Sequence, residues 1–262
     1  MKEVRSVQQM ADGKPIAFIA DVHANLEALK AVISALNILG VKRIINLGDL
    51  VGYGPDPIPC IEAARRFSVN IMGNHDWALF DPERHTVTWA SASAQRIIFW
   101  TAREMKKRTD LLKFVRAFPK SGQAGGMVFT HGCPVANNNR ARMNTYVYPD
   151  PEKYLPVAML FDGRLAFVGH THLPMVGDAN GMVMLPAGTR WEMELDPLRR
   201  YIINPGSVGQ PRDHNPRPSF CILDGNQCSF YRVDYDVRTT MQKILANRVF
   251  NPAYAARLRA GR

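Results

Sequence analysis

RIINLGDLVGYGP (residues 43–55) sets a short apolar run directly before a glycine, an aspartate and a loop with two further glycines. Residues 44–47 are too few for a helix and rich in β-branched side chains, so they predict a buried strand of a parallel sheet. Asp49 stands just past the carboxyl end of that strand. In open α/β sheets this edge binds ligands, because the loops that leave the strands diverge there.

Four further apolar runs end in the same way, in aspartate, asparagine or histidine. The runs and the polar residues after them are 16–20 with Asp21 and His23, 69–72 with Asn74 and His75, 127–130 with His131, and 165–168 with His170 and His172. Five of the chain's seven histidines lie in these ends. Residues two apart in an extended chain point to the same side, so Asp21 and His23 can present two ligands to one crevice, and His170 and His172 can do the same. This distribution predicts a metal site.

Length and composition predict one domain. The chain has 262 residues, of which 46% are hydrophobic, and strand and helix signals run through most of it. We expect a domain over residues 1–235 and a basic helical tail over 236–262 packed on the same domain. Residues 237–262 hold six lysines or arginines and no acid. They predict a solvated helix face first and a nucleic-acid contact second.

The overall charge suits an anionic partner. Lysine and arginine number 33 against 23 acidic residues, which gives a net charge of +10. This excess suits an anionic substrate and equally suits nucleic acid, since charge bears on attraction and not on specificity. No apolar segment is long enough to cross a bilayer, and the first residues lack the apolar core of a signal peptide. We expect a cytoplasmic protein with no membrane association.

The four cysteines show no metal-type spacing, which suits a reducing compartment. A two-residue hairpin turn at Asp224 and Gly225 would place Cys221 opposite Cys228 and allow a cross-strand disulfide. The favoured interpretation is that both are small apolar residues.

The remaining pattern predicts helices first and antiparallel strands later. Residues 25–39 predict a helix capped by Asn25, residues 61–67 a second, and residues 89–118 two more with Trp89, Phe99 and Trp100 in the core. Residues 121–126 predict a loop. Residues 133–150 form a long polar segment beside the expected site, which predicts a role in substrate selection.

With these motifs in order from about residue 16 to 235, the chain resembles the calcineurin-like metallophosphoesterases. The segments LGDLVGYGPDP and NPGSVGQPRD resemble most the small prokaryotic phosphodiesterase-type branch. The resemblance implies an α/β fold, a four-layer αββα sandwich in which two mixed β-sheets face each other. It also implies a dinuclear metal site at the strand ends.

The resemblance also implies the ligand set. Asp21, His23 and His172 resemble the ligands of one ion, Asn74, His131 and His170 those of the other, and Asp49 the carboxylate that bridges both. This donor set suits Mn, Fe, Zn or Ni, and we expect Mn first. The resemblance implies a small anionic phosphate-ester substrate, and two such ions imply hydrolysis of phosphodiesters or nucleotide-type esters through a metal-bridging hydroxide.

Two further residues are candidates for roles in catalysis and substrate binding. His75 resembles the family's non-ligand histidine, which stabilises the transition state or protonates the leaving oxygen. Arg212 follows the segment 204–207 and could hold phosphate oxygens through its planar fork, although a plain surface arginine is as good an interpretation.

One departure bears on the substrate. The protein Ser/Thr phosphatases of this superfamily carry GDxxDRG, and here the last three positions are Gly52, Tyr53 and Gly54. The carboxylate and the arginine are both missing, so a phosphoprotein substrate is disfavoured. The alternatives are a non-catalytic scaffold of the same fold and a nuclease acting on nucleic acid.

Overall fold

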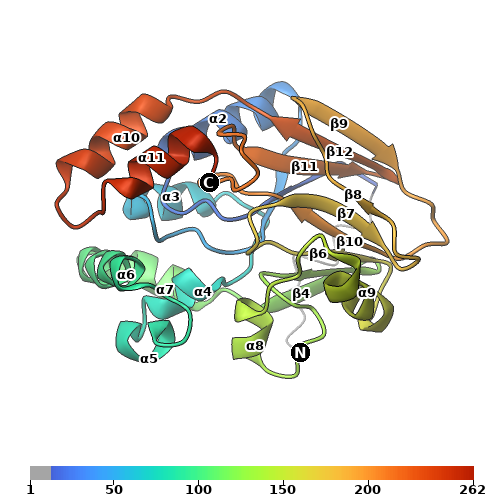
Figure 1. The fold of residues 1–262 in the computed structure, drawn as a ribbon, viewed down its shortest axis with the longest axis horizontal. Coiled ribbons are helices and arrows are strands. Elements are labelled where there is room, and N and C mark those ends of the chain that lie inside the picture. Colours follow the sequence, from blue (N-terminus) through green and yellow to red (C-terminus); the bar gives the residue numbers. More distant parts are fainter. Residues whose placement is uncertain (1–12) are drawn as a thin grey trace.

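The computed structural model describes residues 13–262, and the first twelve residues of the predicted domain lie outside the described part. Two six-stranded sheets face each other and helices cover their outer faces (Figure 1). The predicted four-layer αββα sandwich with two mixed sheets is confirmed.

The strand directions explain why the predicted site residues meet. The first sheet runs in the order β3 (Val69–Asn70), β2 (Arg43–Asn46), β1 (Ile16–Ile19), β11 (Ser219–Asp224), β12 (Gln227–Arg232), β9 (Arg190–Glu194). The second runs β4 (Ser121–Ala124), β5 (Met127–Thr130), β6 (Leu165–Phe167), β10 (Tyr201–Pro205), β7 (Pro174–Asp178), β8 (Val183–Met184). Strands β1, β2 and β3 are parallel, and so are β5, β6 and β10. The carboxyl ends of each parallel set therefore lie side by side at the same end of its sheet.

Alternating side chains build the layers. Along β1, Ile16 and Phe18 point between the sheets, whereas Ala17 and Ile19 point to the outer helices. Phe18 stacks on Phe167 of the opposite sheet with ring centroids 3.5 Å apart. Because both faces of β1 are buried, its sequence is apolar throughout and shows no polar alternation.

The outer helices bury one face each. Helix α2 (Leu26–Ile38) begins at Asn25, whose side chain accepts the backbone N–H of Ala28, as predicted. Helix α3 (Pro57–Ala64) begins four residues before the predicted position, because proline fits the first turn of a helix. Helix α9 (Pro151–Leu160) covers the second sheet through the buried Tyr154.

A group of five helices lies between β3 and α9 in the chain. It comprises α4 (Asn74–Ala78), α5 (Pro82–Thr86), α6 (Ala92–Met105), α7 (Thr109–Arg116) and α8 (Asn139–Asn144). The two predicted helices at 89–118 are confirmed as α6 and α7. The placement of Phe99 in the core is wrong, since 44% of this residue is exposed. The predicted loop at 121–126 holds β4, a polar edge strand paired with β5.

The basic tail forms α10 (Val237–Ala246), which packs beside α2, and α11 (Ala253–Ala260), which packs on α10 (Figure 1). Ile244 and Leu258 are buried, whereas Arg257 and Arg259 face solvent. Lys243 pairs with Glu27 at 2.5 Å and joins the tail to α2. It also pairs with Asp56, the residue before α3, at 2.8 Å.

The hairpin of β11 and β12 corrects the predicted cysteine register. The turn is formed by Gly225 and Asn226, because Asp224 pairs with Gln227. Cys228 therefore lies opposite Leu223, and Cys221 opposite Phe230. Both cysteines are free and buried, in agreement with the favoured interpretation. No helix within residues 13–262 combines the length and the apolar character that a membrane span requires.

Candidate metal centre

The loops that leave the parallel strands hold their polar residues in unusual backbone conformations. Asp21, His23, Asp49, His170 and His172 all have positive φ, between 47° and 69°. Only a few per cent of non-glycine residues adopt such angles, and aspartate and histidine tolerate them better than most. Strain of this kind collects at functional sites, where surrounding structure holds it in place.

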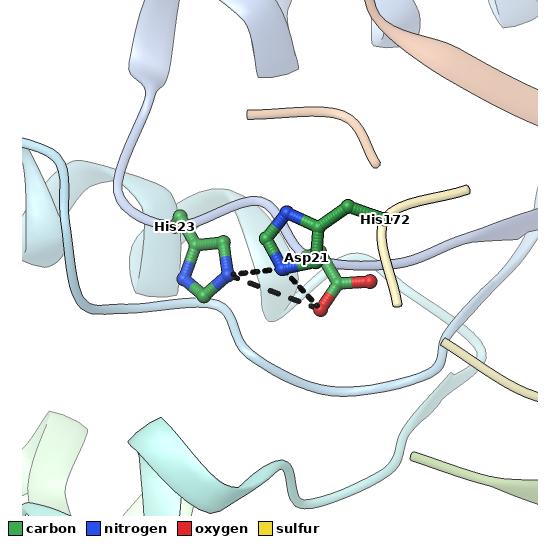
Figure 2. A group of neighbouring side chains, drawn as sticks. All are labelled: Asp21, His23 and His172. Atoms are coloured by element: carbon green, nitrogen blue, oxygen red, sulfur yellow. Dashed lines mark hydrogen bonds and ion pairs between the residues drawn. The ribbon is translucent and has the colours of Figure 1, made fainter. Parts of the chain in front are cut away.

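One group of ligand-type atoms comes from β1 and from the loop after β6. Figure 2 shows Asp21, His23 and His172 pointing toward one another. The Nε2 atoms of His23 and His172 lie 3.1 Å apart. They lie 3.9 and 3.5 Å from Asp21 Oδ1. This carboxylate oxygen is buried and has no hydrogen-bond partner within residues 13–262.

A second group lies beside the first. His131 Nε2 is 3.1 Å from Asn74 Oδ1 and 3.1 Å from His170 Nδ1. It is also 3.2 Å from Asp49 Oδ2, and the same oxygen is 3.9 Å from His23 Nε2. Asp49 thus lies between the two groups, where the predicted bridging carboxylate belongs. All seven predicted ligands meet at one place and are at most 5% exposed.

The outward-facing ring nitrogens show which tautomers are present. Nδ1 of His23 lies 3.0 Å from the carbonyl oxygen of Val51, and Nδ1 of His172 lies 2.6 Å from that of Gln210. A carbonyl oxygen only accepts, so these nitrogens carry the hydrogens. Burial lowers the pKa of both histidines well below its ordinary value, so the rings are neutral.

The lone pairs of His23 and His172 therefore face each other across 3.1 Å without a hydrogen between them. Two acceptors at this distance repel unless a cation lies near both. Imidazoles oriented by backbone carbonyls are also the usual arrangement behind a metal ion. The residues present thus fit divalent metal ions.

The carboxylates differ in charge. Burial raises the pKa of Asp21 to about 7. Burial acts in the same direction on Asp49, but His131 and then His75 outweigh it and hold the pKa of Asp49 well below its ordinary value. Burial opposes protonation of His131, yet Asp49 raises the pKa of that ring to about 9. Metal binding here therefore competes with a proton on His131.

Asp76 is a site residue that the sequence interpretation passed over. Its buried carboxylate accepts the backbone N–H groups of Asp49 at 2.9 Å, Gly73 at 3.1 Å and Val51 at 3.3 Å. It thereby joins the loop after β2 to the start of α4. Its position, three residues past the N-cap Gly73, is the acidic position of a capping box, and that signal was present in the sequence.

The segment 204–207 plays a similar supporting part. Ser207 Oγ donates to the carbonyl oxygen of Asp21 at 2.8 Å. Asn204 Nδ2 donates to the carbonyl oxygen of Gly169 at 2.8 Å. The Ser207 bond joins the loop after β10 to the loop after β1 of the other sheet, and the Asn204 bond fixes the loop after β6 within its own sheet, which explains why the motif NPGS accompanies the ligand motifs.

His75 lies against the site in an aromatic pocket. Its ring centroid is 4.6 Å from those of Tyr53 and Trp89, so Trp89 lines the site and is not a core residue as predicted. Nδ1 of His75 is buried without a partner. A Cβ at Gly52 would come within 2.1 Å of that nitrogen. At the position where the protein phosphatases carry this carboxylate, the chain has Gly52, whose backbone packs closely against His75.

Gly52→Ala should therefore displace His75 and lower kcat/KM by ~10²-fold or more, while metal content stays unchanged. Gly181→Ala is the matched control, since its φ of 94° is close to the 90° of Gly52 and nothing lies within 4 Å of its added Cβ. The check is kcat/KM and metal content of both variants. Equal activity in the two would contradict a role for the Gly52 contact.

Arg212 lies at the same site. Its guanidinium is 5.9 Å from the ring centroid of Tyr53, and Nη2 donates to Gln210 Oε1 at 3.0 Å. Nε is buried without a partner. Its positive charge helps to lower the pKa of His172, after the larger effect of burial. The residue is thus half-buried with one free donor, which suits the predicted contact with an anion better than a plain surface position.

Comparison with known proteins settles the family. Residues 15–227 match the family model of the calcineurin-like phosphoesterase superfamily domain. The chain belongs to this superfamily. It is 35% identical over 241 residues to an uncharacterized protein of Methanocaldococcus jannaschii, covering 89% of this chain and 93% of the relative.

Two solved structures resemble this member of the superfamily along nearly its whole length. A metallophosphoesterase from Sphaerobacter thermophilus is 32% identical, with a TM-score of 0.82 over 96% of this chain and 100% of the other. A hypothetical protein from Pyrococcus horikoshii is 20% identical, with a TM-score of 0.73 over 95% of this chain and 98% of the other, and supports the fold. The predicted family is confirmed.

Proposed function

We propose that this phosphoesterase hydrolyses phosphodiesters or nucleotide-type phosphate esters with two divalent metal ions, Mn before Fe, Zn or Ni. The observation that carries the proposal is the pair of neutral imidazoles of His23 and His172, whose lone pairs face each other at 3.1 Å beside the unpartnered oxygen of Asp21. Ions held there would activate water at neutral pH and neutralise charge on phosphate oxygens.

The chain's own residues supply the remaining tasks. Asp21, His23 and His172 would hold one ion, Asn74, His131 and His170 the other, and Asp49 would contact both. His75 would meet the phosphate from the side of Tyr53 and Trp89. Arg212 would use its free Nε–H on a phosphate oxygen, and its planar fork suits that geometry. No side chain of the site is needed as a covalent nucleophile.

Phosphodiesters are favoured over phosphoproteins because of the loop after Asp49. Gly52 and Gly54 both lie where a side chain would collide, with His75 and with the backbone of residues 23 and 24 respectively. The loop therefore packs closely on the ligands and presents neither a second carboxylate nor a second arginine to a phosphate monoester dianion. A singly charged diester matches this reduced positive charge better.

Mn-loaded protein should hydrolyse bis-p-nitrophenyl phosphate and nucleoside p-nitrophenyl phosphates with a kcat/KM at least ~10-fold above that for a phosphoserine peptide. The physical reason is the missing arginine, because hydrogen bonds to charged groups contribute about 1.5–3 kcal/mol each. Rates are to be measured at equal metal content. A preference for the phosphopeptide would contradict the proposed substrate class.

The same experiments would also identify the two alternative functions, a non-catalytic scaffold and a nuclease. A scaffold would bind metal and hydrolyse none of the esters. A nuclease would act on DNA or RNA, and its binding would weaken steeply with salt. The presence of all seven ligands, His75 and Arg212 around one site favours an enzyme.

A further inference from the structure

A row of aromatic rings extends outward from the metal centre. The ring of Tyr146 stacks on His170, a proposed metal ligand, with centroids 3.9 Å apart and planes 14° apart. Tyr148 stacks on Tyr146 at 5.2 Å and 23°. Both tyrosines belong to the polar segment 133–150. The three rings form a ladder whose inner end is fixed at the site.

The outer part of this ladder is open. Tyr146 is 39% exposed and Tyr148 is 37% exposed, although both are large aromatic residues. The ammonium of Lys153 lies 5.4 Å from the centroid of Tyr148. Its side chain is 60% exposed and, in the described part of the chain, forms an ion pair only with Asp150, at 3.3 Å. A flexible, solvated lysine gives way readily to a flat ligand.

Positive charge lies on the inner side of the ladder. Arg212 interacts with the side chain of Tyr146 and also lies beside Tyr53. Its Nε is buried with no partner. A ligand that contacts both Arg212 and the tyrosine rings would need two groups. One is an anion, which would lie near Arg212 and the metal ligands, and the other is a flat ring, which would stack on the tyrosines.

The spacing separates the anion from the ring. His170 covers one face of Tyr146 and Tyr148 stacks on the same ring, so the ring face left open to a ligand is that of Tyr148, at the outer end of the ladder and away from the metal ligands. An aryl phosphate carries its ring directly on the ester oxygen and would not span this gap. A nucleoside 5′-phosphate carries a sugar between phosphate and base, which suits it.

We infer that Tyr146 and Tyr148 form a stacking platform for the nucleobase of the substrate, so that the preferred substrates are nucleoside phosphoesters. This inference rests on the proposed function and narrows it to one substrate class. Stacking on the tyrosines would contribute affinity without choosing strongly among bases, because every base presents a π face.

Calorimetric titration of Mn-loaded protein with AMP and with ribose 5-phosphate tests the platform, since the two differ only by the base. Wild-type protein should bind AMP more tightly. Tyr148→Ala should weaken AMP binding by roughly 5- to 150-fold and change ribose 5-phosphate binding by less than about 2-fold. Tyr148→Phe keeps the ring and should retain the preference for AMP.

Equal affinity of the wild type for the two ligands would overturn the inference, and so would an equal loss of both ligands in Tyr148→Ala. Phosphate release is assayed on the same samples, so failure of the proposed function is distinguishable from failure of the platform. A protein that hydrolyses no ester but still prefers AMP through Tyr148 would refute the enzyme and keep the platform. Hydrolysis of the esters without any preference for the base would support the enzyme and refute the platform.

Discussion

Asp49→Asn should lose both metal and activity, with at least ~100-fold weaker Mn binding, since even loss of a residue that merely orients a ligand typically costs 10–100-fold. Asp49 Oδ2 lies 3.2 Å from His131 and 3.9 Å from His23, so one residue serves both groups. The substitution keeps the shape and removes the anion. The measurements are bound metal after dialysis, Mn affinity and kcat/KM.

Asp178→Asn is the matched control for this substitution. Asp178 is also fully buried, but it pairs with Tyr201 at the opposite end of β10 from the site and forms an ion pair with Arg199. Its loss should lower stability and leave metal content intact. Added Mn should raise the Tm of wild type and of Asp178→Asn, but not that of Asp49→Asn. Unchanged turnover of metal-free wild type would end the metal-dependent mechanism.

His75→Ala should slow hydrolysis according to the leaving group. If His75 protonates the leaving oxygen, an alkyl or nucleoside leaving group should lose ~10²–10⁴-fold and a p-nitrophenyl group distinctly less, since p-nitrophenolate departs without a proton. Metal content should stay the same, because the residue's structural link to the ligands is its backbone N–H, which donates to Asp49 Oδ1 at 2.9 Å.

The environment of His75 determines how equal losses with both ester types would be interpreted. Burial lowers the pKa of this ring to about 4 in the absence of substrate, and a bound anionic phosphate opposes that effect. A neutral His75 could still donate a hydrogen bond to a phosphate oxygen. Equal losses with both ester types would then assign it this role and exclude proton donation. Equal rates in wild type and variant would leave it a packing residue.

The ligand set could be predicted because strand ends are easy to recognise and parallel strands bring them to one edge. Asp21, Asp49 and His131 each follow an apolar run that is buried on both faces. Pairing of parallel strands places Asp21 beside Asp49, because β1 and β2 are neighbours in one sheet. His131 follows β5 of the other sheet, and its place beside them was implied by the family resemblance.

The parts that could not be predicted lie where local sequence carries little signal. Strand β4 reads SGQA and β9 reads RWEME, and both are edge strands that need pairing on one side only. Phe99 belongs to a set of apolar residues that recur at helical spacing in α6. This spacing identifies an apolar face of the helix but does not show whether another element packs against it. For Asp76 the local sequence shows only its capping-box position after Gly73, because its other two backbone partners, Asp49 and Val51, come from a distant part of the chain.

The division of donors between the two sheets has a consequence for maturation. The first sheet supplies Asp21, His23, Asp49 and Asn74, which are mainly oxygen donors, and the second supplies three imidazoles. The ligands of the first sheet all lie within residues 21–74 and are synthesised first, but β1 pairs with β11, so that sheet is completed only when residues 190–232 have been made. Neither set of ligands is complete alone, so a nascent chain would hold ions weakly. Which metal the finished enzyme carries would then depend on the ions available when the last strands pair.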